Sequence, residues 1–217
     1  MPIAELGNAC SNLPMTPAIL DALPLRPTRR PVQRGPVSVA FQGERGAYAH
    51  LAVERVFGPR AWLVTTRTFA DVVRAVKQGT AAYGVLPVRN TVIGEIPGVR
   101  ALLDDPALEL ALEVEQPVVH CLLGHAGVSP EEVTQVYSHP VALAQCGRFL
   151  SAHPAMVPHE WHDTAGAARE ISVRRQRHEA AIAAAPAAAR YGLQLLASDI
   201  ADVRDNSTWY VVVQRAA

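Results

Sequence analysis

The chain has 217 residues, of which 49% are hydrophobic and 18% charged, so it can form one domain or two small lobes with a packed core. The 20 lysine and arginine residues balance 20 aspartate and glutamate residues, and this zero net charge argues against a nucleic-acid-binding protein. The three cysteines, Cys10, Cys121 and Cys146, match neither a disulfide framework nor a zinc motif.

No stretch of the sequence approaches the roughly 20 apolar residues needed to cross a bilayer. The N-terminus lacks the basic segment followed by an apolar run that is typical of a signal peptide. We therefore expect a cytoplasmic protein that binds neither a membrane nor nucleic acid.

Prolines recur throughout residues 1–36, and three arginines lie near the end of this segment. This composition predicts an N-terminal proline-rich arm that is extended or disordered. The alternative is an arm that packs on a neighbouring subunit.

From residue 37 onward, short β-rich runs alternate with helical stretches. This order predicts mainly parallel sheets with helices on both faces. A long strand-like run over 109–123 is long enough to cross from one lobe to another. The predicted strands are 37–41, 61–64, 83–87, 133–137, 156–159, 180–184 and 209–214, and the predicted helices are 47–57, 69–78, 141–153, 165–174 and 186–191.

The two α/β series predict two lobes with a cleft between them. We assign residues 37–111 and 192–217 to the first lobe, and residues 112–191 to the second. The last strand thus returns the chain to the first lobe.

Ligands of open parallel sheets bind at the carboxyl ends of the strands, and four such junctions carry polar or glycine residues. Residues 42–48 contain two glycines, which permit a tight turn and the close approach of a ligand. The segment Arg89-Asn90-Thr91 places a guanidinium, an amide and a hydroxyl directly after an apolar strand. An ordinary turn and a capped helix start explain these two junctions equally well.

The other two junctions, Ser138-His139-Pro140 and Asp163-Thr164, each precede a predicted helix. Proline favours the first position of a helix, and the free N–H groups of a helix start bind anions. Gln145 lies two turns beyond Ser138 and shares its helix face. Capping alone also explains these residues. Together the junctions predict a cleft suited to a small carboxylate.

Metal and nucleotide sites lack their sequence signatures. His159 and His162 do not have the spacing of a zinc protease motif, and no phosphate-binding loop follows a strand. We interpret Cys146 as a packing residue. We therefore expect no metal site.

Seven segments, in this order, resemble the catalytic domain of the prephenate and arogenate dehydratases. The resemblance extends from Val37 to Gln214. The segments are FQGERGAY (41–48), VLPVRNTVIGEI (85–96), HCLL (120–123), SHPVALAQC (138–146), DTAGAA (163–168), AAIAAAPAAARYGL (180–193) and NSTWY (206–210).

The resemblance implies a two-lobed α/β fold similar to type II periplasmic binding proteins, with the site in the interlobe cleft. It implies a lyase of phenylalanine biosynthesis that removes water and carbon dioxide from prephenate to give phenylpyruvate. No metal or organic cofactor takes part, the substrate is a small dicarboxylate, and family members form homo-oligomers, here a dimer or tetramer. Because the sequence ends at Ala217 without a regulatory ACT domain, we expect no phenylalanine inhibition through such a domain.

The family's catalytic threonine falls on Thr208 in the segment Thr208-Trp209-Tyr210, and we expect Thr208 to protonate the leaving hydroxyl. Asn90 is the second predicted catalytic residue. The residues predicted to bind the substrate are Ala47, Arg89, Thr91, Ser138, Gln145, Thr164 and Ala165.

Four positions depart from the family pattern, and two of them, Ala49 and Thr91, each replace a serine. Trp209 replaces the arginine after the catalytic threonine, and Arg89 replaces an acidic residue. One hypothesis is that the two changes compensate, with Arg89 supplying the lost guanidinium. The rival hypothesis is an altered activity, so arogenate dehydratase, prephenate decarboxylase and a non-catalytic small-carboxylate-binding module stay as alternatives.

Overall fold

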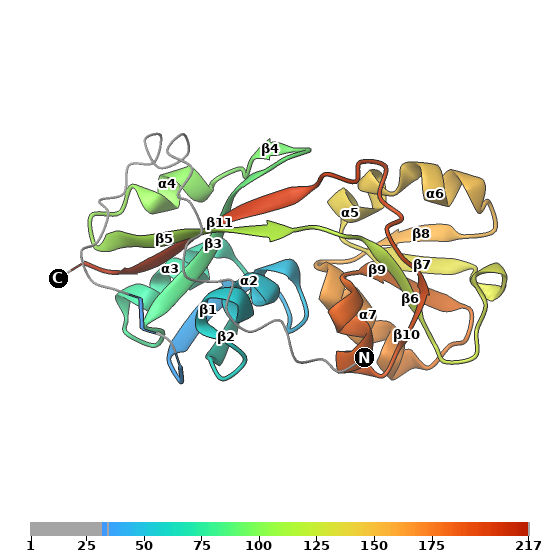
Figure 1. The fold of residues 1–217 in the computed structure, drawn as a ribbon, viewed down its shortest axis with the longest axis horizontal. Helices are drawn as coiled ribbons and strands as arrows, with labels where there is room; N and C mark the ends of the chain where they lie inside the picture. Colours follow the sequence, from blue (N-terminus) through green and yellow to red (C-terminus); the bar gives the residue numbers. More distant parts are fainter. Residues whose placement is uncertain (1–31, 34, 217) are drawn as a thin grey trace, which may run out of the picture.

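Two β-sheets, each with helices on both faces, form two lobes that lie side by side (Figure 1). This computed structural model describes residues 32–33 and 35–216. The predicted arm over 1–36 lies outside the described residues, apart from its last few positions.

The first lobe contains a six-stranded sheet in the order β2-β1-β3-β11-β5, with β4 paired to β3. Its last strand in sequence, β11, lies between β3 and β5 and so brings the end of the chain back into the first lobe. The strands are β1 (Ser38–Gln42), β2 (Trp62–Thr66), β3 (Tyr83–Asn90), β4 (Gly94–Glu95), β5 (Leu108–Pro117) and β11 (Ser207–Arg215).

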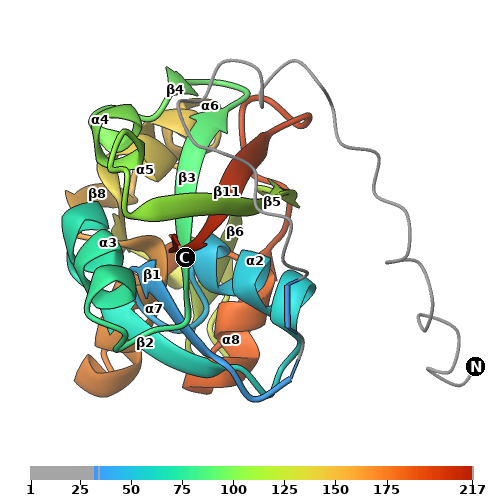
Figure 2. The same ribbon diagram turned by 90° about the vertical axis from the view of Figure 1, so that its left-hand side faces the viewer.

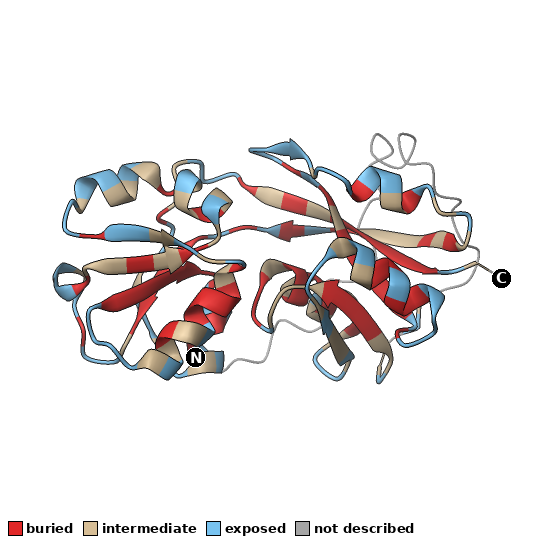
Figure 3. Cartoon of the chain, turned by 180° about the vertical axis from the view of Figure 1, so that it is seen from behind, coloured by how far each residue is buried: buried red, intermediate tan, exposed pale blue. Residues whose placement is uncertain are grey.

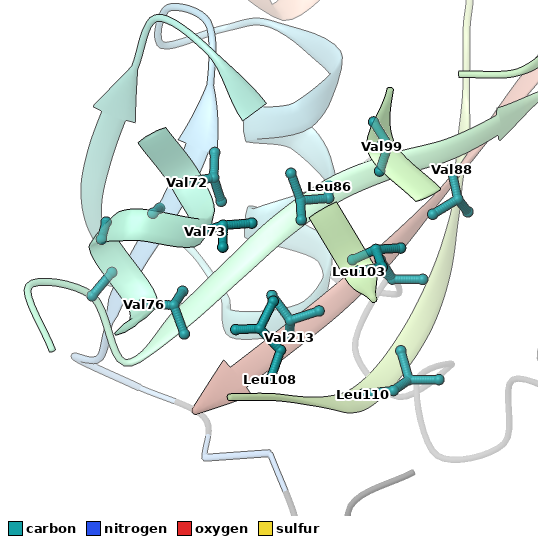
Figure 4. Close-up of a cluster of buried hydrophobic side chains, with 14 residues drawn as sticks. Val72, Val73, Val76, Leu86, Val88, Val99, Leu103, Leu108, Leu110 and Val213 are labelled. Atoms are coloured by element: carbon teal, nitrogen blue, oxygen red, sulfur yellow. The ribbon is translucent and has the colours of Figure 1, made fainter. Parts of the chain in front are cut away.

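Helices cover both faces of this sheet, with α3 and α4 on one side and α2 on the other (Figure 2). On the α3 side, Val72, Val73 and Val76 of α3 belong to the same buried cluster as Leu86 of β3 (Figure 4). On the α2 side, Phe57 packs with Phe41 of β1. The helices are α2 (Tyr48–Phe57), α3 (Phe69–Lys77) and α4 (Val99–Leu103).

The second lobe contains a five-stranded sheet in the order β10-β6-β9-β7-β8. Helices α5 and α6 pack on one face, and α7 and α8 on the other. The elements are β6 (Cys121–Gly124), a 3₁₀ turn (Pro130–Glu132), β7 (Gln135–Ser138), α5 (Pro140–Gln145), α6 (Gly147–Ala152), β8 (Val157–Glu160), α7 (Thr164–Arg174), β9 (Glu179–Ala183), α8 (Ala185–Tyr191) and β10 (Gln194–Ala197).

Small side chains let the layers of the second lobe approach closely. Strand β9 is buried along its whole length, and its residues 180, 181 and 183 are alanines. Figure 3 shows that the buried residues gather on the central strands of the sheets. Ala167 and Ala168 of α7 pack directly against this strand. In the part of the chain that the structure describes, no helix has both the length and the apolar composition to cross a bilayer.

Both sheets are mixed, which differs from the mainly parallel sheets expected from the sequence. Strands β2, β1 and β3 run parallel to one another, as do β8, β7 and β9. Strand β11 is antiparallel to both of its neighbours, and β6 is antiparallel to β9 and β10. The chain passes from the first lobe to the second between β5 and β6, and it returns between β10 and β11. Because these two connections run in opposite directions, β11 is antiparallel to β5, and β10 is antiparallel to β6.

Two short segments connect the lobes, and they are hydrogen-bonded to each other. The N–H of Val118 donates to the carbonyl of Asn206 over 2.8 Å, and the N–H of Ile200 donates to the carbonyl of His120 over 3.0 Å. The lobes therefore divide between β5 and β6 and between β10 and β11. These boundaries differ from the predicted ones, because residues 112–117 belong to the first sheet and β10 to the second.

The predicted helix over 141–153 is two helices, α5 and α6. Cys146 separates them, with φ −113° and ψ 26°, which lie outside the helical region. The break ends α5 at Gln145, whose side chain faces the cleft described below.

Gly84 is the point of closest packing between β3 and α3. A Cβ atom built at this position lies 2.9 Å from Cγ1 of Val72 and 3.0 Å from Cγ2 of Val76. Both neighbours are β-branched and cannot rotate away easily. We expect Gly84→Ala to lower the free energy of unfolding by about 1–3 kcal/mol, measured by denaturant titration.

The matched control for this substitution is Gly124→Ala. Its added Cβ meets Cδ1 of Leu196, which is the far end of a flexible side chain and can move aside. We expect a smaller loss there. Equal losses for the two variants would contradict the packing argument.

Candidate active site between the two lobes

A cavity of about 350 Å³ opens between the two lobes, next to the connecting segments. Both lobes supply its walls, which are largely apolar with a few polar groups. Such a cavity suits a small molecule with an apolar ring and polar substituents. Its lining residues are Gln42, Gly43, Ala47, Tyr48, Ala49, Phe69, Pro87, Asn90, Ile93, Ile96, Pro97, Val118, His120, His139, Val141, Ala142, Gln145, His162, Asp163, Thr164, Thr208 and Tyr210.

Asn90 and Thr208 face each other across the β3–β11 pairing and are both buried. The Nδ2 group of Asn90 donates to Oγ1 of Thr208 over 2.9 Å. The Oδ1 atom of Asn90 accepts from the N–H groups of Val92 and Ile93, which determines the orientation of the amide. Since the Thr208 oxygen accepts this bond, its own hydrogen is available to an acceptor in the cavity.

A chain of hydrogen bonds leads from Asn90 into the second lobe. Asn90 Nδ2 also donates to Oδ1 of Asn206 over 2.8 Å and to the carbonyl of Ser207 over 3.0 Å, so its two hydrogens serve three acceptors. Asn206 Nδ2 in turn donates to Oε1 of Gln145 over 3.2 Å. The same Gln145 oxygen lies 2.8 Å from Nε2 of His120, and His120 Nδ1 lies 3.0 Å from the hydroxyl of Tyr48. The chain thus joins residues of both lobes through the connecting segments.

The network determines the protonation of His120. Burial lowers the pKa of His120, although its hydrogen bond with Gln145 acts in the opposite direction. A neutral imidazole has one donor and one acceptor, so Nε2–H donates to the Gln145 oxygen and Nδ1 is left as an acceptor. The single hydrogen of the Tyr48 hydroxyl has two acceptors within reach, the carbonyl of Val119 at 2.8 Å and His120 Nδ1 at 3.0 Å. Burial also raises the pKa of Tyr48 well above its ordinary value, which keeps the phenol a donor.

Asp163 is the carboxylate of the cavity, and it caps α7. Its Oδ1 accepts from the N–H of Ala165, and its Oδ2 accepts from the N–H of Glu44, each over 2.9 Å. Gly43 has φ +106°, a conformation that favours glycine and lets its loop approach Asp163. The second bond joins the two lobes.

The cavity is poor in positive charge. Among the described residues that line it, none is a lysine or an arginine. Burial lowers the pKa of His139, against the effect of nearby Asp163, as it does for His120. Any anionic substrate therefore depends on N–H and O–H donors for its binding.

Five of the predicted site residues line the cavity: Ala47, Asn90, Gln145, Thr164 and Thr208. The other four do not. Ser138 is fully buried and donates to the carbonyl of Ile182 over 2.6 Å, and buried Ala165 supplies only its N–H to Asp163. The hydroxyl of Thr91 contacts the backbone of Ser207 in both directions, which ties β3 to β11.

Arg89 is exposed, and its guanidinium lies 5.1 Å from the centre of the Trp209 ring. The two residues are cross-strand partners, and Trp209 packs against the α3 side of the sheet. Alternate residues of a strand face opposite ways, so Arg89 and Trp209 point away from Asn90 and Thr208. This geometry gives no support to the hypothesis that Arg89 supplies a guanidinium to the site.

Four polar residues of the site were not among the predicted catalytic or substrate-binding residues: Tyr48, His120, Asp163 and Asn206. Asp163 was expected only as a helix cap. Each lies inside a segment that carries the family resemblance, but spacing alone does not bring them together. Tyr48 and His120 are 72 positions apart, and Asn90 and Asn206 are 116 apart.

Comparison with protein families identifies this architecture. The family model for prephenate dehydratase matches residues 39–217. The chain belongs to the prephenate dehydratase family. The match covers both lobes and every element that lines the cavity.

Curated relatives of this family are similar to the chain over most of its length. Arogenate dehydratase 1 of Petunia hybrida is 38% identical over 94% of the chain, and the bifunctional chorismate mutase/prephenate dehydratase of Escherichia coli is 33% identical over 82%. The chain covers 47% of each of these two proteins, so it spans about half the length of these relatives.

Solved structures of the family share the fold. Prephenate dehydratase from Arthrobacter aurescens, in complex with L-Phe, aligns with a TM-score of 0.73 at 28% identity, covering 83% of this chain and 61% of that one. GqqA, described as a novel type of quorum quenching acylase, aligns with a TM-score of 0.75 at 33% identity, covering 83% of this chain and 64% of that one.

The lowered pKa of buried His120 makes stability depend on pH. Between the folded pKa and the ordinary value near 6.5, the unfolded chain binds more protons, so stability falls as the pH drops through this window. When the pH is lowered from about 7.5 to about 5.5, the free energy of unfolding should fall less in the His120→Gln variant than in the wild type. Denaturant titration at the two pH values measures the difference.

The control for this measurement is His178→Gln, at an exposed position far from the cavity. We expect this variant to keep the pH dependence of the wild type. If His120→Gln also kept it, buried His120 would not be the group that titrates.

Proposed function

We propose that this protein is a dehydratase that removes water and carbon dioxide from prephenate or arogenate. The observation that carries this proposal is the buried pair of Asn90 and Thr208, in which the threonine hydroxyl accepts from the amide and keeps its hydrogen for the cavity. Membership of the prephenate dehydratase family agrees with this chemistry.

The reaction needs little from the protein, because it produces an aromatic ring. The bond to the ring carboxylate breaks and releases carbon dioxide, and its electron pair enters the ring. The ring then expels the hydroxyl on the opposite carbon, and the Thr208 hydroxyl protonates the departing oxygen to give water. Protonation in the transition state and orientation of the substrate supply the catalysis.

Asn90 positions this acid. By donating to Oγ1 of Thr208, its amide directs the hydroxyl hydrogen away from β3, and the donation stabilises negative charge on the oxygen as the proton leaves. The same amide holds Asn206, which connects the pair to Gln145 and His120. Catalytic groups of the first lobe are thereby linked to the wall formed by the second.

Thr208→Val tests the role of the hydroxyl, since valine keeps the shape and removes the acid. We expect a loss of turnover of about 10²-fold or more, with prephenate and arogenate each assayed by mass spectrometry of their products. Thr208→Ser should retain more activity than Thr208→Val. The matched control is Thr65→Val on exposed β2, which should keep wild-type turnover.

Product masses also separate the competing activities. Release of carbon dioxide with retention of water would indicate a decarboxylase. Binding of substrate without any product would indicate a carboxylate-binding module. Either result would contradict the dehydratase proposal.

Asn90→Asp tests the positioning argument. The new carboxylate keeps an acceptor for the N–H groups of Val92 and Ile93 but replaces the donor to Thr208 with a second acceptor. The threonine hydrogen then points to residue 90 and not to the substrate. We expect kcat to fall by about tenfold or more with little change in KM, which steady-state kinetics measures. A change confined to KM would show that Asn90 serves binding alone.

We further propose that the protein is cytoplasmic and assembles as a homo-oligomer, a dimer or a tetramer. Support comes from the resemblance to the prephenate dehydratase family. Light scattering coupled to size-exclusion chromatography measures the oligomeric state, and a single monomeric species would contradict this proposal.

A further inference from the structure

Asp163 is a carboxylate placed where an anionic substrate would otherwise find a helix N-terminus. Its Oδ1 takes the first N–H of α7, at Ala165, and its Oδ2 takes the N–H of Glu44 from the glycine loop. The side chain is 6% exposed and lines the cavity. The two N–H groups hold the carboxylate in place from both lobes.

The rest of the cavity does not offset this negative charge. Within the ranges of the chain that the structure describes, no lysine or arginine lines the cavity, and burial lowers the pKa of His120 and His139. Arg169 pairs with Glu44 over 3.5 Å, and neither of these two residues lines the cavity. A substrate whose only charged groups are two carboxylates is therefore repelled by the Asp163 carboxylate, and no described lining lysine or arginine offsets this repulsion.

The two candidate substrates differ at one group that responds to this charge. Prephenate carries a keto group beside its side-chain carboxylate, whereas arogenate carries an ammonium group there. An ammonium group donates up to three hydrogen bonds, and each oxygen of Asp163 has a further lone pair to accept one. A keto oxygen is an acceptor and gains nothing from a carboxylate.

We propose that Asp163 is a specificity-determining residue that selects the amino-acid substrate, arogenate, over the oxo acid, prephenate. This inference rests on the proposed dehydratase function of the same cavity. It assigns Asp163 to the substrate's ammonium group and Thr208 to the leaving hydroxyl, at separate positions of the cavity wall.

Asp163→Asn and Asp163→Ser test the proposal while keeping the helix start. Asparagine and serine cap helices as well as aspartate does, so both variants should fold. We expect the wild type to show a kcat/KM for arogenate at least about tenfold above that for prephenate, and we expect both variants to reduce this ratio at least about tenfold.

The matched control is Glu44→Gln, which removes a carboxylate close to Asp163 that does not line the cavity. We expect its preference for arogenate to stay near the wild-type value. A wild type that prefers prephenate, or a ratio unchanged in both Asp163 variants, would overturn the proposal.

Binding separates this inference from the proposed function. Calorimetry with the Thr208→Val variant measures the affinity for each intact substrate. Tighter binding of arogenate that is lost in the Thr208→Val, Asp163→Asn double variant supports the role of Asp163 even if the wild type proves inactive. Equal binding of the two substrates, or binding of neither, would overturn the inference.

Discussion

The hydrogen bond from the Asn90 amide to the Thr208 hydroxyl is the interaction on which the site depends. It requires β3 and β11 to pair in the register that sets these residues opposite each other. That register in turn requires the chain to return to the first lobe after completing the second. A threonine is a weak acid, so its usefulness depends on the direction of its hydrogen, and the amide sets that direction because its own oxygen is bound to the backbone.

Most of the order of strands and helices followed from the sequence, because local patterns determine it. Pro140 begins α5 as expected, and Asp163 caps α7 as expected. The antiparallel insertion of β11 did not follow, since strand direction depends on how two distant connections run between the lobes. The break at Cys146, the short elements α4, β4 and β10, and the division of the run 109–123 into β5 and β6 were also missed, because such short features leave no periodic pattern.

Prediction of the site had a similar limit. Asn90, Gln145 and Thr208 came from motifs and all line the cavity. His120 looks like a core residue in the apolar run HCLL, and only the fold places its two ring nitrogens between Tyr48 and Gln145. Arg89 and Trp209 are neighbours of these residues in sequence, yet the alternation of the strands turns both side chains to the opposite face.

The two connecting segments have a mechanical consequence. Asn90 and Thr208 belong to the sheet of the first lobe, whereas Gln145 and Asp163 belong to the second lobe. A hinge rotation about the paired segments would leave the acid and its partner undisturbed while it separated Glu44 from Asp163. Opening would therefore admit the ligand to Thr208 and Asn90 in their final arrangement. Closing would then bring Gln145 and Asp163 of the second lobe against the ligand, so that discrimination between ligands would follow their binding.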